Sequence, residues 1–255
     1  MLTVQTLASG SKGNATYIES GTTRVLVDVG LALPAMLQRL ESANIDGASI
    51  DAILITHEHS DHITGVGRFA TKFGTIVYVH ESAFDAFMKR AKSVPQHQVQ
   101  LFDTPFTIGD IDVDFFSLPH DSSFCFGYTF TCGESKFSMA TDLGFMRDDI
   151  YEKMLGSQIV LLESNHDMNK LSLNKKYPDW LKRRIAGRTG HLSNQSAGVA
   201  AARLLEQGTE QIILGHLSEE NNSPTLAYRV VSDFVGEKMK IYVAPQDVVG
   251  ERLSI

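Results

Sequence analysis

The chain has 255 residues, of which 43% are hydrophobic, so it can bury a sizeable core in one large domain or two small ones. The formal net charge of −7 at pH 7 argues against a surface that attracts polyanions as a whole. Two cysteines cannot form a disulfide framework, the first residues lack the pattern of an export signal, and no apolar stretch is long enough to cross a bilayer. We therefore expect a soluble cytoplasmic protein without a membrane segment.

Short strands and helices alternate along the whole chain. In the first half, hydrophobic periodicity predicts strands at 3–8, 16–19, 24–29, 51–56 and 76–79, and helices at 34–43, 66–73 and 82–92. In the second half it predicts strands at 99–108, 111–118, 126–132, 136–141, 158–163, 211–214, 240–243 and 248–253, and helices at 150–155, 179–185, 193–207 and 224–234. This order indicates two sheets packed face to face with helices outside, in one domain over residues 1–255.

A dense group of metal-ligating residues follows one of these apolar strands. His57 and His59 are two positions apart, so they project the same way from an extended chain. Asp61 and His62 fall where the chain turns toward a helix expected to begin near Ile63. Imidazole and carboxylate are ligands that zinc, manganese and iron accept. A lone histidine is more often a surface or capping residue, but four such ligands in six residues favour a metal site.

Three later strands also end in side chains of this kind. His120, Asp142 and His216 each follow an apolar strand closely, at the end where open sheets gather their sites. Any one of them alone would be an ordinary turn residue. Together with the first group, they predict a shared metal centre.

In order and spacing, these residues resemble the motif series of the metallo-β-lactamase fold, and the resemblance covers essentially the whole chain. It implies a four-layered αβ/βα sandwich of two mixed sheets, with the metals at the sheet edge. It also implies that Asp28 supports the metal loop by orienting a ligand. The implied ligands are His57, His59 and His120 for one metal, Asp61, His62 and His216 for a second, and Asp142 as a bridge between them.

The spacing and identity of the later motifs limit the branch of the superfamily. True β-lactamases usually carry a cysteine where this chain has Asp142, so antibiotic hydrolysis is disfavoured. Only 74 positions (216 − 142) separate Asp142 from His216, too few for the large β-CASP insert of some nuclease relatives.

Three further stretches, at residues 9–14, 162–167 and 190–194, resemble the YycJ/WalJ/VicX family. That resemblance implies a 5′→3′ exonuclease on double-stranded DNA. His191 is similar to the histidine of the His-x-Ser motif of tRNase Z and would protonate the departing 3′-oxygen. His166 is either a further site residue or solvent-facing. The residues assigned to catalysis are Asp61 and His191, and those assigned to substrate binding are Asn14, Asn165, Ser193 and Asn194.

The predicted reaction is therefore phosphodiester hydrolysis by a hydroxide that bridges two divalent ions, zinc or manganese, with iron also possible. The main alternative is a thioester or lactone hydrolase on the same fold. A non-catalytic regulatory module and a di-iron redox protein are further alternatives. The sequence identifies no protein partner.

A basic segment at residues 170–188 is the expected grip on a DNA substrate. It carries seven lysines and arginines against Asp179 alone, in a chain that is acidic overall. Trp180 and Tyr177 lie within it, either as stacking or as packing residues.

Overall fold

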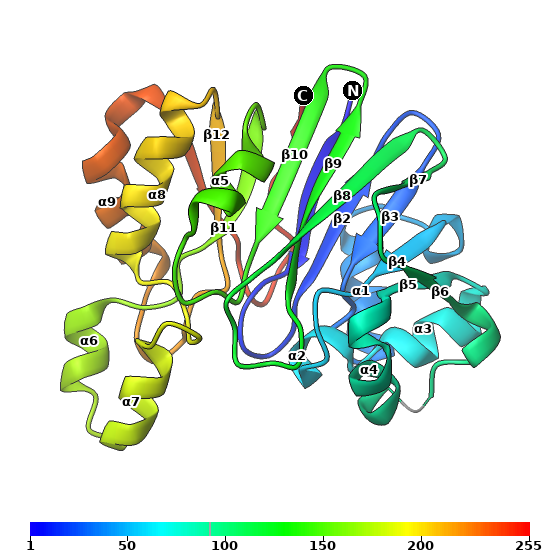
Figure 1. Cartoon of the computed structure of the whole chain (residues 1–255), viewed down its shortest axis with the longest axis horizontal. Helices are drawn as coiled ribbons and strands as arrows, with labels where there is room; N and C mark the ends of the chain where they lie inside the picture. The colour runs from blue at the N-terminus through cyan, green and yellow to red at the C-terminus, as the bar shows by residue number, and fades with distance from the viewer. Residues whose placement is uncertain (92) are drawn as a thin grey trace.

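Two seven-stranded mixed sheets form the centre of the computed structural model, which describes residues 1–91 and 93–255 (Figure 1). Sheet A has the strand order β14-β1-β2-β3-β4-β5-β6, and sheet B has the order β13-β12-β11-β10-β9-β8-β7. The strands of sheet A are β1 (Thr3–Ala8), β2 (Ala15–Glu19), β3 (Arg24–Val27), β4 (Ala52–Leu54), β5 (Ile76–His80), β6 (Val99–Phe102) and β14 (Arg252–Ser254). Those of sheet B are β7 (Phe106–Ile108), β8 (Ile111–Ser117), β9 (Phe126–Cys132), β10 (Ser135–Ala140), β11 (Ile159–Glu163), β12 (Gln211–Gly215) and β13 (Lys240–Val243).

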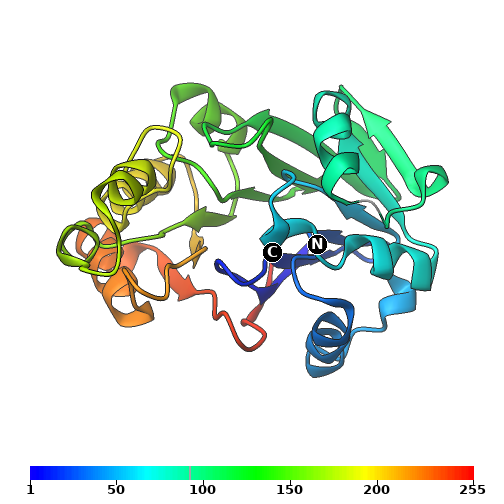
Figure 2. The same cartoon turned by 90° about the horizontal axis from the view of Figure 1, so that it is seen from below.

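Helices cover the outer face of each sheet and complete four layers (Figure 1). Helices α1 (Leu33–Ser42), α3 (Val66–Phe73) and α4 (Phe84–Arg90) lie beside sheet A, and α5 (Asp148–Met154), α8 (Asn194–Glu206) and α9 (Pro224–Val235) lie beside sheet B. Three further helices, α2 (Ser60–Ile63), α6 (Met168–Leu173) and α7 (Asp179–Ile185), lie toward the side from which Figure 2 views the molecule. The predicted αβ/βα sandwich is confirmed. Among the described residues, no helix has the length and apolar character needed to span a bilayer.

The sequence of β11 shows why the layers pack in this way. Ile159 and Leu161 belong to the core between the two sheets, whereas Val160 and Leu162 belong to the core between sheet B and its helices. Because both faces of the strand are covered, it is apolar throughout, as is typical of a buried parallel strand. The core between the sheets contains residues from both sheets.

The parallel parts of the two sheets bring several strand ends to one edge of the sandwich. Strands β3 and β4 pair in parallel in sheet A, and β10, β11 and β12 pair in parallel in sheet B. Strand β8 runs in the same direction as β10, because both pair antiparallel with β9. The segments that follow these strands contain every metal ligand predicted from the sequence.

One predicted strand is wrong in a way that matters for the fold. The apolar run at 99–108 forms two strands rather than one, β6 in sheet A and β7 in sheet B. Pro105 lies between them, and proline has no backbone N–H to donate to a strand ladder. The break passes the chain from the first sheet to the second.

Smaller differences concern helix and strand limits. Helix α2 begins at Ser60, not near Ile63, so Asp61 and His62 lie on a helical turn. Helix α6 was not predicted, although Asp167 caps it by accepting a 2.9 Å hydrogen bond from the Lys170 amide. The last strand covers Arg252–Ser254 rather than 248–253. The predicted helix at 82–92 is α4, and its expected end at Lys92 lies outside the described residues.

Candidate metal centre

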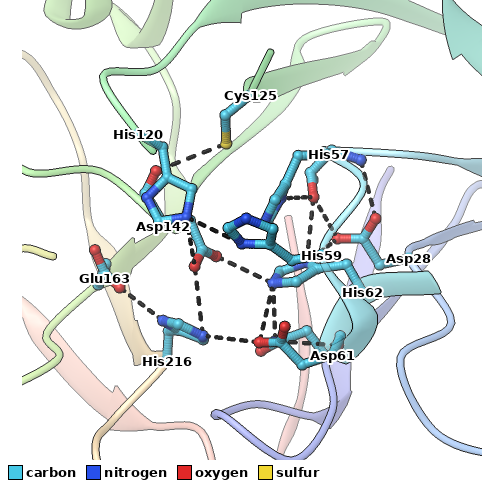
Figure 3. Close-up of polar contacts among 12 residues, drawn as sticks. Asp28, His57, His59, Asp61, His62, His120, Cys125, Asp142, Glu163 and His216 are labelled. Carbon is cyan, nitrogen blue, oxygen red and sulfur yellow. Dashed lines mark hydrogen bonds and ion pairs between the residues drawn. The ribbon is translucent and has the colours of Figure 1, made fainter. Parts of the chain in front are cut away.

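The ligand-type side chains predicted from the sequence converge at the sheet edge (Figure 3). They fall into groups whose nitrogen and oxygen atoms lie within 4.8 Å of one another. One group is formed by three histidines from two loops, and another combines two histidines with a carboxylate. The members of these two groups are His57, His59 and His120, and Asp61, His62 and His216.

Asp142 lies between the two groups. Its Oδ2 atom is 3.2 Å from His62 Nε2, and its Oδ1 atom is 3.5 Å from His216 Nε2. The same Oδ1 atom is 3.8 Å from Nε2 of His120, which belongs to the other group. One carboxylate thus faces ligands of both groups, the position that a bridging residue requires.

Several of these buried atoms have no hydrogen-bond partner within the described part of the chain. They are His57 Nε2, His216 Nε2 and Asp142 Oδ2. A buried polar atom without a partner is costly, and three such atoms within the ligand groups need a common explanation. Imidazole nitrogens and carboxylate oxygens at this spacing fit a divalent metal ion.

Asp28 holds one of the predicted ligands, His62, in place through a hydrogen bond to its ring. Its Oδ2 atom accepts hydrogen bonds from His62 Nδ1 at 2.7 Å and from Thr56 Oγ1 at 2.7 Å. Its Oδ1 atom accepts from the Thr56 amide at 2.9 Å. With Nδ1 held in this way, Nε2 of His62 faces the metal position.

Three residues of the centre have a strained backbone. Asp28, Asp142 and His216 have φ angles of 61°, 65° and 55°, in the left-handed region that side chains other than glycine rarely adopt. Each such residue costs on the order of 1–3 kcal/mol and persists only where its surroundings hold it. The Asp28 amide donates to the Leu54 carbonyl at 2.9 Å, and the His216 amide donates to Ser9 Oγ at 2.8 Å.

Glu163, at the end of β11, is a residue of the centre to which sequence reasoning gave no role. It is fully buried and accepts hydrogen bonds from Nδ1 of His191 at 2.8 Å and Nδ1 of His216 at 2.7 Å. It also accepts from the amides of Leu143 and Leu192, both at 3.0 Å. Burial alone would raise the pKa of Glu163, but the two imidazoles outweigh burial and lower that pKa. A carboxylate after an apolar strand was the available signal, the same one that identified Asp142.

His191 lies at the rim of the centre. Its Nδ1 atom is 3.8 Å from Asp142 Oδ1, and its side chain is 23% exposed, against 3% or less for His62, His120 and His216. Burial lowers the pKa of His191, but Glu163 outweighs this effect and leaves the pKa above its ordinary value. His191 is therefore a solvent-accessible imidazole that Glu163 favours in its protonated form.

Asn14 and Asn165 both lie at the centre. Asn14 Nδ2 is 3.1 Å from His62 Nε2 and 3.4 Å from Asp61 Oδ2, so this amide reaches the ligand atoms themselves. Asn165 Nδ2 instead donates to the backbone carbonyl of His216 at 2.8 Å.

The other residues predicted to bind substrate, Ser193 and Asn194, make contacts within the protein. Ser193 caps α8, its Oγ accepting from the Ser196 amide at 3.2 Å. Asn194 is fully buried and accepts a 2.7 Å hydrogen bond from Ser164 Oγ. His166 is buried rather than solvent-facing, and neither of its ring nitrogens has a partner within the described residues.

The fold and this cluster define a metallohydrolase of the β-lactamase superfamily. The family model described as Beta-lactamase superfamily domain matches residues 23–217. Among solved structures, the chain is similar to the metallo-β-lactamase fold protein YhfI from Bacillus subtilis, with 18% identity, a TM-score of 0.74 and coverage of 99% of each chain. It is also similar to a diphosphatase from the PhnP family, with 16% identity, a TM-score of 0.71 and coverage of 100% of this chain and 98% of that one.

Two curated relatives give a narrower assignment. The exodeoxyribonuclease YycJ of Bacillus anthracis is 36% identical over 234 residues, covering 91% of this chain and 88% of the relative. The exodeoxyribonuclease WalJ of Streptococcus pneumoniae is 37% identical over 253 residues, covering 94% of this chain and 93% of the relative. The chain therefore belongs to the YycJ/WalJ family, as its motifs indicated, and this membership implies divalent metal binding at the cluster.

Metal binding is expected to release protons and to weaken as the pH falls. Burial alone would lower the pKa values of His62 and His216, but nearby carboxylates raise both in the metal-free protein. Asp142 and Asp28 raise the pKa of His62. Asp142, Asp61 and Glu163 raise the pKa of His216. A metal needs these imidazoles neutral, so it must displace their protons. Zinc titration of the metal-free protein should give proton release in weak buffer and an apparent affinity that rises from about pH 6 to pH 8, a range that lies below the raised pKa of His62, about 10. An affinity independent of pH over this range would contradict the prediction.

Gly30 is expected to be essential for the metal loop. A Cβ atom at Gly30 would lie 1.8 Å from the Asp61 carbonyl oxygen, so Gly30→Ala must displace the segment that carries Asp61 and His62. We expect this variant to lose bound metal, measured by elemental analysis after dialysis. Gly21→Ala is the matched control, because a Cβ there would meet nothing within 4 Å. Normal metal content in Gly30→Ala would refute this packing argument.

Proposed function

We propose that this protein is a dinuclear metal phosphodiesterase that works as a 5′→3′ exonuclease on double-stranded DNA. The observation that carries the proposal is the accessible His191 imidazole, which Glu163 fixes beside Asp142 and the metal ligands. A protonated imidazole at the rim of a metal centre is suited to cleaving an ester whose leaving group needs a proton. The two curated relatives, both exodeoxyribonucleases, support the choice of DNA.

The two ligand groups, joined by Asp142, would hold two divalent ions, zinc or manganese with iron also accepted. Bound there, the ions would lower the pKa of water to about 7 and stabilise negative charge on the phosphoryl oxygens. Asp61 has a double role in this proposal, as a ligand and as a carboxylate facing the reacting centre. It is partly exposed, whereas Asp142 is buried.

His191 acts as the general acid in the proposed mechanism. Its Nδ1–H donates to Glu163, so its Nε2–H is the proton available to the departing 3′-oxygen. After that transfer, the neutral ring keeps its Nδ1–H on Glu163 and therefore keeps its orientation. Glu163 also holds His216 through the same oxygen atom, which fixes the acid relative to a metal ligand.

The four polar residues assigned to the substrate divide into two kinds in this proposal. Asn14 contacts the substrate phosphate, because its amide already lies among the ligand atoms. Asn165, Ser193 and Asn194 act by positioning the loops that carry His216 and His191, because their side chains bond within the protein.

We also infer that the protein works in the cytoplasm. Cys125 and Cys132 are both free, and Cys125 is buried. Unpaired cysteines without a disulfide framework are typical of a reducing compartment. This inference is independent of the catalytic proposal.

The polarity and the metal requirement can be tested together. Duplex DNA labelled at its 5′ ends should release mononucleotides progressively when manganese or zinc is added. His59→Ala, which removes a ligand of the first group, should lose bound metal and cleavage together. If the metal-loaded protein cleaves neither DNA nor RNA, the thioester and lactone substrates become the better candidates.

The acid role of His191 predicts a dependence on the leaving group. His191→Ala should keep its metal and lower kcat on DNA by about 10²–10⁴-fold. It should lose much less on thymidine 5′-(4-nitrophenyl phosphate), because 4-nitrophenolate leaves without a proton. His97→Ala, which changes an exposed histidine, is the matched control. An equal loss on both substrates would remove the acid role while leaving the nuclease assignment intact.

A further inference from the structure

We propose that the helical hairpin formed by α6 and α7 binds unpaired nucleotides of the DNA substrate through one face of α7, which carries Trp180 and Arg183. The inference rests on the proposed nuclease function and names the part of the substrate that this surface takes. The basic segment noted in the sequence folds into this hairpin, which extends from the end of the sandwich where α2 lies (Figures 1 and 2).

The end of α7 is bonded directly to the metal centre. The His191 amide donates to the Ile185 carbonyl at 2.8 Å. His120 Nδ1 lies 3.3 Å from the Gly190 carbonyl oxygen, so the turn after α7 contacts a metal ligand. Arg184 on α7 forms an ion pair with Asp121, the residue next to that ligand. The C-terminal end of α7 is therefore fixed to the proposed cleavage site.

Most of the basic side chains of the hairpin already make contacts within the protein. The ammonium group of Lys170 donates to a backbone carbonyl, as does that of Lys182. Lys176 pairs with Glu220, and the guanidinium of Arg188 lies over the Phe145 ring. With Arg184 paired to Asp121, two of the seven basic side chains remain without such a partner among the described residues, and both are exposed. They are Lys175 and Arg183.

Trp180 lies beside one of these two cations. It is 62% exposed, although burying a large aromatic side chain is normally favourable. Trp180 and Arg183 are three residues apart on α7, so they share a helix face. Arg183 also lines a groove of about 340 Å³ between α6 and α7, together with Met168 and Asp179. Because Asp179 contributes a negative charge to this groove, the groove has mixed charge rather than a strongly basic lining.

An exposed indole beside a free guanidinium fits an unpaired nucleotide better than a duplex. Aromatic side chains stack on base faces, and a duplex covers those faces except at its ends. A guanidinium beside the ring can contact the adjoining phosphate. A 5′→3′ exonuclease on a duplex leaves the complementary strand unpaired as it advances, so its own reaction supplies such nucleotides.

Trp180 provides its own reporter, because the chain contains one tryptophan. The metal-loaded protein would be titrated with phosphorothioate DNA, either a duplex with a single-stranded tail or a blunt duplex of equal charge. Stacking should quench tryptophan fluorescence with the tailed DNA, and at lower concentration than with the blunt duplex. No quenching by the tailed DNA, or equal quenching by both at equal concentration, would overturn the inference.

Variants separate stacking from general electrostatic attraction. Trp180→Ala should raise the KM for tailed DNA about tenfold relative to the KM for a small phosphodiester, and Trp180→Phe should restore much of the loss. Arg183→Gln should raise that KM more than Lys176→Gln, which removes the same charge from a side chain already paired. Tyr228→Ala changes an exposed aromatic on α9 and is the control for surface truncation.

The outcomes also separate this inference from the proposed function. Quenching by tailed phosphorothioate DNA, together with no cleavage of ordinary tailed or blunt DNA, would support the hairpin as a binding surface and refute the nuclease. Cleavage with a normal KM in Trp180→Ala would leave the nuclease in place and refute the binding surface. A hairpin that serves a protein or an apolar ligand instead would give this second result.

Discussion

The geometry of the metal centre depends on one buried carboxylate. Glu163 accepts hydrogen bonds from the rings of His191 and His216 and from the amides of Leu143 and Leu192. A carboxylate without water is costly to bury, by several kcal/mol, unless its lone pairs are satisfied. The segments after β10 and β12 and the turn before α8 therefore satisfy one charge together, and none of them can move without leaving it underbonded.

This shared bond explains how the protein tolerates strain where it places ligands. Asp142 and His216 adopt the left-handed backbone region just after their strands. Glu163 accepts a hydrogen bond from the amide that follows Asp142 and another from the ring of His216, so it holds both turns. Asp28 is strained in the same way and is held through Thr56 and His62 instead. Left-handed residues let the chain turn off the end of a strand at once, so that the ligand stays at the sheet edge.

The strand ends that bear the predicted ligands could be identified from the sequence, because an apolar run that stops at a histidine or aspartate is a local signal. Every predicted ligand lies in the centre for that reason. Glu163 shows the limit of the approach, since its ring partners lie 28 and 53 residues away and only the fold brings them together. The division of residues 99–108 between two sheets could not be predicted either. Both halves have the pattern of a strand, and the sheet that each joins is decided by tertiary contacts.

The acidic net charge and a DNA substrate are compatible once the charges are placed in the structure. Four of the acids, Asp28, Asp61, Asp142 and Glu163, lie in the metal centre, where histidines and divalent ions would offset them. Most cations of the hairpin are engaged within the protein, Lys176 and Arg184 with acids and Lys170 and Lys182 with backbone carbonyls, so few of them are free to contact a phosphate. Substrate affinity in such a protein must come from short-range contacts at the strand end, where stacking and metal ions act, rather than from long-range attraction. That is the behaviour expected of an enzyme that works on DNA termini.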